Sequence, residues 1–196
     1  MGPDLGRAYD VLRNDVTLAF TNWAIYRELY SDPERLRLLN DVAATLFAML
    51  QRTLLWDVIL QLARLVDAPE TGRKQNLTLQ SLPPLVLDAA LRRDVEAGVA
   101  ACCIACESAV VWRHRRLAHR DLGVALQPEN DPLPEILFDS IEQALALFQA
   151  LLNLLEEHFN NGGTVAYSMI RLSVKADGLM YFLKKGLEAE ARRTEI

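Results

Sequence analysis

The chain of 196 residues contains only three cysteines. It therefore has little capacity for the disulfide bonds or metal sites that stabilise small proteins without a large core. Cys102, Cys103 and Cys106 form a Cys-Cys-x-x-Cys group. No second Cys or Cys/His pair completes four zinc ligands, and no βαβ pattern surrounds them as in a thioredoxin-type site. We interpret the thiols as small buried core residues. The sequence predicts neither a metal site nor a cofactor.

Aromatic residues are also scarce, at 7% of the chain, whereas 51% of the residues are hydrophobic and Leu and Ala are abundant. Strands favour aromatic and β-branched residues, so this composition favours packed helices. The chain is long enough to bury a substantial core. We therefore predict one all-α domain over residues 1–196.

Targeting and membrane segments are not evident. The N-terminal sequence has no basic region followed by an apolar core, so we expect no secretory signal. The most apolar segment, Ala97 to Trp112, is shorter than the roughly 20 residues of a membrane span and contains Glu107. We expect a cytoplasmic protein that makes no contact with a membrane.

Basic residues are fewer than acidic ones, and the chain has a net charge of −5. This charge argues against a protein that coats nucleic acid. The exception is the run from Trp112 to Asp121, which holds four arginines and two of the three histidines. Its net charge of +3 leaves −8 on the remainder, so phosphate binding would be focused here. The alternative is a solvated helix end, where cations interact favourably with the helix dipole.

The prolines lie at element boundaries rather than within periodic segments, which predicts four or five long helices. Ser31-Asp32-Pro33-Glu34 is typical of a capping box, and Gly123 suits a left-handed helix end. The second and fourth predicted helices are so apolar that we expect an additional interface and a homodimer. The helices are predicted at about residues 5–30, 31–66, 83–123, 134–159 and 164–191, with a loop containing at most one helical turn at 67–82 and a linker at 124–133.

The second predicted helix carries polar residues near its end. Asp57, Gln61 and Arg64 recur at three- to four-residue spacing along one stripe. We expect Asp57, Arg64 and Asp67 to form a buried polar network that fixes the helix register.

Arg113 and His119 are the candidate catalytic pair. On one straight helix they would lie about 120° apart and about 9 Å along the axis. A shared site would then need a bend, a reaching arginine, or a second copy of the motif from a partner subunit.

The motif resembles a known family. An arginine, a polar residue, a short spacer and a histidine on a helical domain are similar to the R-x(4–6)-H signature of HEPN domains. The segment Arg113-His-Arg-Arg-Leu-Ala-His-Arg-Asp121 resembles the RNKRLAHRD-type segment of the AbiU-type abortive-infection subfamily, with His114 where asparagine is common. The resemblance covers residues 15–160, and further similar stretches are Trp23 to Tyr30, Asp57 to Asp67 and Asn76-Leu-Thr-Leu.

The resemblance implies a metal-independent endoribonuclease that acts as a homodimer in defence or as a toxin, with an antitoxin protein as a further partner. In this interpretation His119 transfers protons and Arg113 stabilises negative charge on phosphate. His114 orients Arg113 or the RNA substrate. The guides of the RNA backbone would be Arg115, Arg116 and Arg120.

Three alternatives stay open. Asp121 either orients a catalytic histidine or forms an ion pair with an arginine such as Arg120. The domain is either catalytic or a non-catalytic HEPN module that binds RNA, nucleotide or a protein partner. A helical interaction protein with an incidental motif would lose no function when Arg113 and His119 are replaced.

Overall fold

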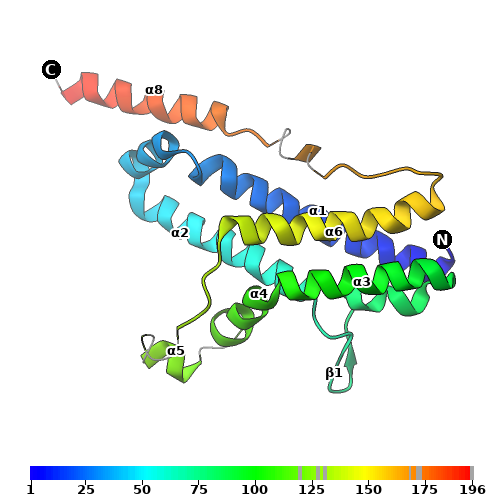
Figure 1. Ribbon diagram of the computed structural model, residues 1–196. Coiled ribbons are helices and arrows are strands. Elements are labelled where there is room, and N and C mark those ends of the chain that lie inside the picture. The colour runs from blue at the N-terminus through cyan, green and yellow to red at the C-terminus, as the bar shows by residue number, and fades with distance from the viewer. Residues whose placement is uncertain (119–120, 127–128, 130–131, 168, 171–173, 195–196) are drawn as a thin grey trace. The chain divides into compact units, whose positions relative to one another are not determined.

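The computed structural model describes residues 1–118, 121–126, 129, 132–167, 169–170 and 174–194, and it is predominantly helical (Figure 1). This confirms the all-α prediction. The helices and strands are α1 (Pro3–Tyr30), α2 (Pro33–Leu65), β1 (Glu70–Thr71), β2 (Lys74–Gln75), the 3₁₀ turns η1 (Leu79–Ser81) and η2 (Pro83–Leu85), α3 (Ala89–Ala105), α4 (Glu107–Trp112), the π-helical turn η3 (Arg113–Leu117), α5 (Leu122–Leu126), α6 (Phe138–Phe159) and α8 (Asp177–Thr194).

The chain forms two compact units. The first comprises residues 1–19 and 58–167, and the second comprises residues 20–57 and 168–196. The division falls inside α1 and inside α2, so each of these helices contributes one end to each unit.

The core of the first unit is built from four helical segments. The α3 and α6 helices lie side by side (Figure 1), and a Cβ at Gly98 would lie 2.9 Å from the Leu151 side chain. Asp88 caps α3 by accepting hydrogen bonds from the backbone N–H groups of Ala90 and Leu91. Buried residues of the four segments include Leu12 and Val16 of α1, Ile59 and Leu62 of α2, Val95 and Cys102 of α3, and Phe148 and Leu152 of α6.

The segment that follows α2 is more ordered than the expected loop with one helical turn. The strands β1 and β2 pair in an antiparallel hairpin, and Gly72 at its turn has a positive φ of 63°. The Asn76 side-chain amide donates to the Ala68 carbonyl and to the Thr71 hydroxyl. These contacts close the hairpin before the chain enters η1 and η2.

The second unit begins with three neighbouring aromatic residues on α1, of which the first two are stacked and the third is tilted. The rings of Trp23 and Tyr26 are 5.3 Å apart and parallel to within 6°, and Tyr30 follows at 5.4 Å from Tyr26. The Tyr30 hydroxyl donates to the Phe47 carbonyl of α2. Ala43 of α2 has non-helical angles, so the helix is kinked there. The aromatic stack therefore packs α1 against a bent α2.

The middle of α2 exposes an apolar stripe. Leu46, Met49 and Leu50 are exposed to between 42% and 56%, and their spacing of three and one residues after the kink places them on one helix face. By length and composition α2 is apolar enough to cross a membrane, as is the bent pair of α3 with α4 and η3 among the described residues. The interpretation of Ala97 to Trp112, which is too short for a span, as the most apolar segment missed α2. Helices that pack on other helices meet the same criteria, and the absence of membrane contact stays a prediction.

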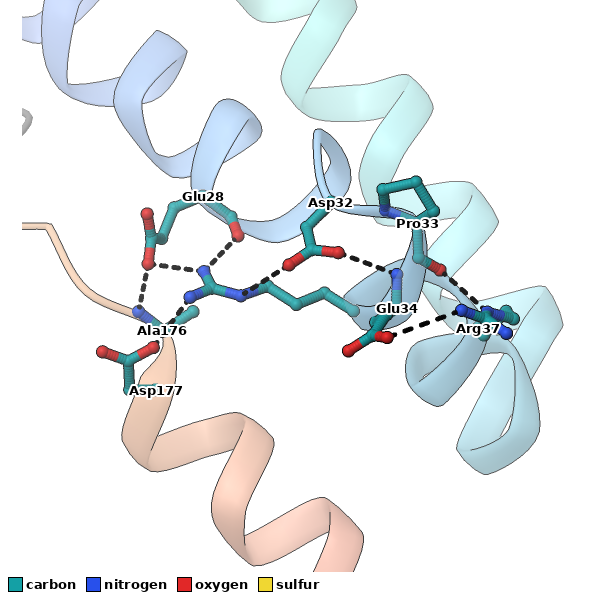
Figure 2. A network of polar contacts seen from close by, with 8 residues as sticks. Glu28, Asp32, Pro33, Glu34, Arg37, Ala176 and Asp177 are labelled. Carbon is teal, nitrogen blue, oxygen red and sulfur yellow. Dashed lines mark hydrogen bonds and ion pairs between the residues drawn. The ribbon is translucent and has the colours of Figure 1, made fainter.

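Arg35 of α2 joins three segments of the second unit through its partners Glu28 and Asp177, which Figure 2 labels. Its Nη1 donates to the Glu28 carboxylate at 2.5 Å, and its Nη2 donates to the Asp177 carboxylate of α8 at 2.7 Å. The Glu28 carboxylate also accepts from the backbone N–H of Ala176. The hydrogen bond from Arg35 lowers the pKa of Glu28 below 4.5. This stabilisation is present above pH 4.5 and is lost as the pH falls through the lowered pKa.

The predicted helix boundaries hold at some ends and fail at others. Asp32 caps α2 by accepting from the Glu34 backbone N–H, which places the predicted cap one residue after Ser31. The third predicted helix begins at Ala89 instead of near Pro83 and breaks at Cys106. Gly123 lies inside α5 rather than ending a helix. The fourth helix begins at Phe138 and the last at Asp177, later than the predicted 134 and 164.

Replacing Arg35 should loosen the start of α8. Arg35→Ala leaves the Glu28 and Asp177 carboxylates without their shared partner, and we expect a loss of about 1–2 kcal/mol in the docking of α8. Hydrogen exchange of residues 177–185 should accelerate roughly 5- to 30-fold. Arg37→Ala is the matched control, because Arg37 is 73% exposed. Equal exchange in both variants would contradict the role of Arg35.

Candidate functional site

The basic run does not lie on one straight helix. The helix axes before and after Cys106 differ by 55°, and the backbone then forms the π-helical turn η3 at Arg113–Leu117. The Ala118 N–H donates to the Arg113 carbonyl at 2.8 Å, and the Asp121 N–H donates to the Arg115 carbonyl at 3.1 Å. Arg113 therefore follows a bend, which is one of the three conditions expected for a shared site, whereas His119 lies outside the described residues. Such π turns are rare in proteins overall, but those that occur are frequently at functional sites.

The Arg113 guanidinium is held on two sides. Its Nη1 donates to the Asp67 carboxylate, and its Nη2 contacts Nε2 of His114. A guanidinium nitrogen can only donate, so this contact requires an unprotonated Nε2 on His114. The Arg113 side chain is 18% exposed and that of Asp67 is 24% exposed. The cation is thus fixed in position while part of it stays open to solvent.

The Gln80 side chain holds the backbone at Asp67, just after the end of α2. The Gln80 side-chain amide donates to the carbonyls of Val66 and Asp67 at 2.7 Å and 3.0 Å. Val66 is buried beside it, with 5% exposed. The carbonyl end of a helix also attracts a cation. The sequence therefore brings Arg113 to a place where both a carboxylate and a helix terminus favour its charge.

The predicted network of Asp57, Arg64 and Asp67 does not form. Asp57 accepts a hydrogen bond from the Asn22 side chain at 2.6 Å, and Asp67 pairs with Arg113. The Arg64 side chain is exposed and makes no hydrogen bond or ion pair with any part of the chain that the structure describes, and only its backbone carbonyl accepts a hydrogen bond from the Asp67 N–H, at 3.3 Å. One turn of α2 separates residues 64 and 67, but Asp67 lies beyond the helix end, where the helical spacing no longer applies.

Among the other residues of the run, some make structural contacts and others are exposed. The Asp121 carboxylate accepts from the Val124 N–H at 3.0 Å and lies 3.6 Å from Arg115. The Val124 hydrogen bond lowers the pKa of Asp121, so Asp121 caps α5 and pairs with Arg115. Arg116 is exposed. His119 and Arg120 lie outside the described residues.

The cysteines behave as core residues. Cys102 and Cys106 are buried and Cys103 is half-buried. Burial raises the pKa of Cys102 to about 12 and also raises those of the other two thiols. No group of three or more His, Cys, Asp or Glu side chains within the described ranges is arranged to hold a metal ion.

Comparison with protein families identifies the family of this chain. The AbiU2 family of HEPN domains matches residues 2–178. This chain belongs to the AbiU2 HEPN family. It is therefore a HEPN module of the abortive-infection type, and the match extends beyond the residues 15–160 of the expected resemblance. Comparisons with curated proteins and with solved structures give no match.

Within this HEPN module, sequence reasoning identified the residues of the site but not their partners. Asp67 was expected to pair along α2, whereas it pairs with Arg113. Gln80, which positions Asp67, was not singled out. The only local signal was that Asp67 and Gln80 flank a hairpin, which brings distant residues together.

Breaking the Arg113–Asp67 pair should destabilise the first unit. Asp67→Ala leaves a partly buried guanidinium without its carboxylate, and we expect a loss of about 1–3 kcal/mol in the free energy of unfolding by urea. Arg64→Ala is the control and should change it by less than about 0.5 kcal/mol. In a double-mutant cycle with Arg113→Ala the losses should not add. Additive losses would contradict a direct interaction.

Proposed function

We propose that this HEPN module is an endoribonuclease of an abortive-infection system that cleaves RNA without a metal ion. The observation that carries the proposal is the Arg113 guanidinium, which Asp67 and His114 hold at a π-helical turn six residues before His119. The family match supports the biological setting.

The chemistry uses the nucleophile that RNA supplies. The 2′-oxygen attacks the adjacent phosphorus and loses its proton, the bond from phosphorus to the 5′-oxygen breaks, and that oxygen takes up a proton. The products are a 2′,3′-cyclic phosphate and a 5′-hydroxyl. In the proposal His119 transfers the protons. Arg113 donates hydrogen bonds to the phosphoryl oxygens, on which negative charge grows.

The geometry of Arg113 suits this role. A guanidinium has five N–H donors, and the contacts to Asp67 and His114 engage two of its nitrogen atoms. A fixed cation loses little conformational entropy when it binds phosphate. Arg115 and Arg116 follow on the same turn and add positive potential for the RNA backbone.

The test is cleavage of a mixed RNA pool in the presence of a chelator. Arg113→Ala and His119→Ala should each lower the cleavage rate roughly 100-fold or more. Arg93→Ala, which removes an exposed arginine of α3, should cleave at the wild-type rate. Mass spectrometry of the products should find cyclic phosphate ends.

Two results would overturn the proposal. Equal cleavage by all four proteins would identify a contaminating nuclease. RNA binding without cleavage by the wild-type protein would favour the alternative, a non-catalytic HEPN module.

We also propose that the active form is a cytoplasmic homodimer whose toxicity an antitoxin protein restrains. The support for self-association is the exposed stripe of Leu46, Met49 and Leu50 on α2, because water-exposed apolar patches mark interaction surfaces. A second copy of the chain presents the same stripe, as a two-fold interface requires.

Charge on this stripe should separate the subunits. We expect Leu46→Glu with Met49→Glu to shift the mass measured by light scattering from dimer to monomer. Ile104→Glu is the control, because Ile104 of α3 is 68% exposed and lies off the stripe. Dissociation of the Ile104 variant instead would move the interface away from α2.

A further inference from the structure

A groove of about 400 Å³ lies in the first unit beside the Arg113–Asp67 pair. It lies where the end of α2 and η1 meet α3 and α4. Its volume falls within the range of small-ligand sites. The lining residues are Val66, Gln80, Cys103, Glu107, Val110 and Val111.

The groove lies near the candidate site, because two of its lining residues are close in the chain to the residues of the ion pair. Val66 precedes Asp67, and Gln80 donates to the carbonyls of both residues. Val110 lies three residues before Arg113, which is about 4.5 Å along a helix axis and on the same face. A nucleotide whose phosphate contacts Arg113 therefore has this groove within reach of its base.

Two side chains of the groove, Gln80 and Glu107, offer hydrogen-bond acceptors. The Gln80 amide nitrogen already donates to two carbonyls, which leaves the side-chain oxygen of Gln80 to accept. The Glu107 side chain is exposed and has no hydrogen bond or ion pair with the described part of the chain. Its carboxylate accepts two hydrogen bonds. The Cys103 thiol is kept neutral because burial raises its pKa.

This set of acceptors matches one base. Guanine presents N1–H and the 2-amino group next to each other, so two donors face a carboxylate at once. Adenine and cytosine place an acceptor nitrogen beside their amino group, and uracil flanks its single N–H with two carbonyl oxygens. Single-stranded RNA is read on such Watson–Crick edges. The side chains of Val66, Val110 and Val111 supply apolar contacts for the faces of the ring.

We propose that this groove binds a guanine base of the RNA substrate, with Glu107 accepting hydrogen bonds from N1–H and the 2-amino group. The inference rests on the proposed ribonuclease function, because it places the guanine next to the phosphate at Arg113. Glu107 and Gln80 are then the residues that determine base specificity.

The test measures binding separately from cleavage. Full-length His119→Ala protein is titrated with fluorescent oligouridine that carries one G, A, C or inosine at its centre. The G oligonucleotide should bind roughly tenfold or more tightly than the A and C oligonucleotides, and inosine, which lacks the 2-amino group, should bind more weakly than G. Adding Glu107→Gln should abolish the preference, because an amide replaces one acceptor with a donor.

The control is Glu96→Gln, which makes the same change at an exposed site on α3 and should keep the preference. Equal binding of all four oligonucleotides, or a preference that Glu107→Gln leaves intact, overturns the guanine site. If RNA cleavage then still depends on Arg113, the ribonuclease proposal stands without it. A guanine preference that Glu107→Gln removes supports the groove even if the wild-type protein cleaves nothing.

Discussion

The ion pair between Asp67 and Arg113 is the contact on which the candidate site depends. It connects the end of α2 to the π-helical turn that follows α4. A flexible arginine would spread its charge over many positions, but this one is held by a carboxylate on one side and by His114 on the other. In the proposed function this fixed position directs the guanidinium to one phosphate rather than to RNA in general.

The backbone around this pair departs from regular helix, and the departure shapes the site. The bend at Cys106 and the π turn at Arg113 redirect the basic run, while Asp121 caps the short α5 that comes next. Glu107 lies exposed at the start of α4, directly after this bend, and lines the groove together with Val66 and Val110.

A separate polar cluster organises the second unit. Arg35 bonds to Glu28 and Asp177 and so attaches the start of α8, whereas the apolar stripe of α2 stays uncovered. One unit thus carries a fixed arginine site, and the other carries a surface suited to self-association.

The sequence by itself determined the helical class, the buried state of Cys102 and Cys106 and the position of α1, because periodicity and composition act over a few neighbouring residues. The residues of the basic run also indicate the HEPN family, and the family match confirms this. Only the tertiary structure decided that Asp67 pairs with Arg113 rather than with Arg64, and that Gln80 and Glu107 share a groove. Those contacts join segments far apart in the chain, and the bend and π turn that align them have no distinct pattern in the sequence.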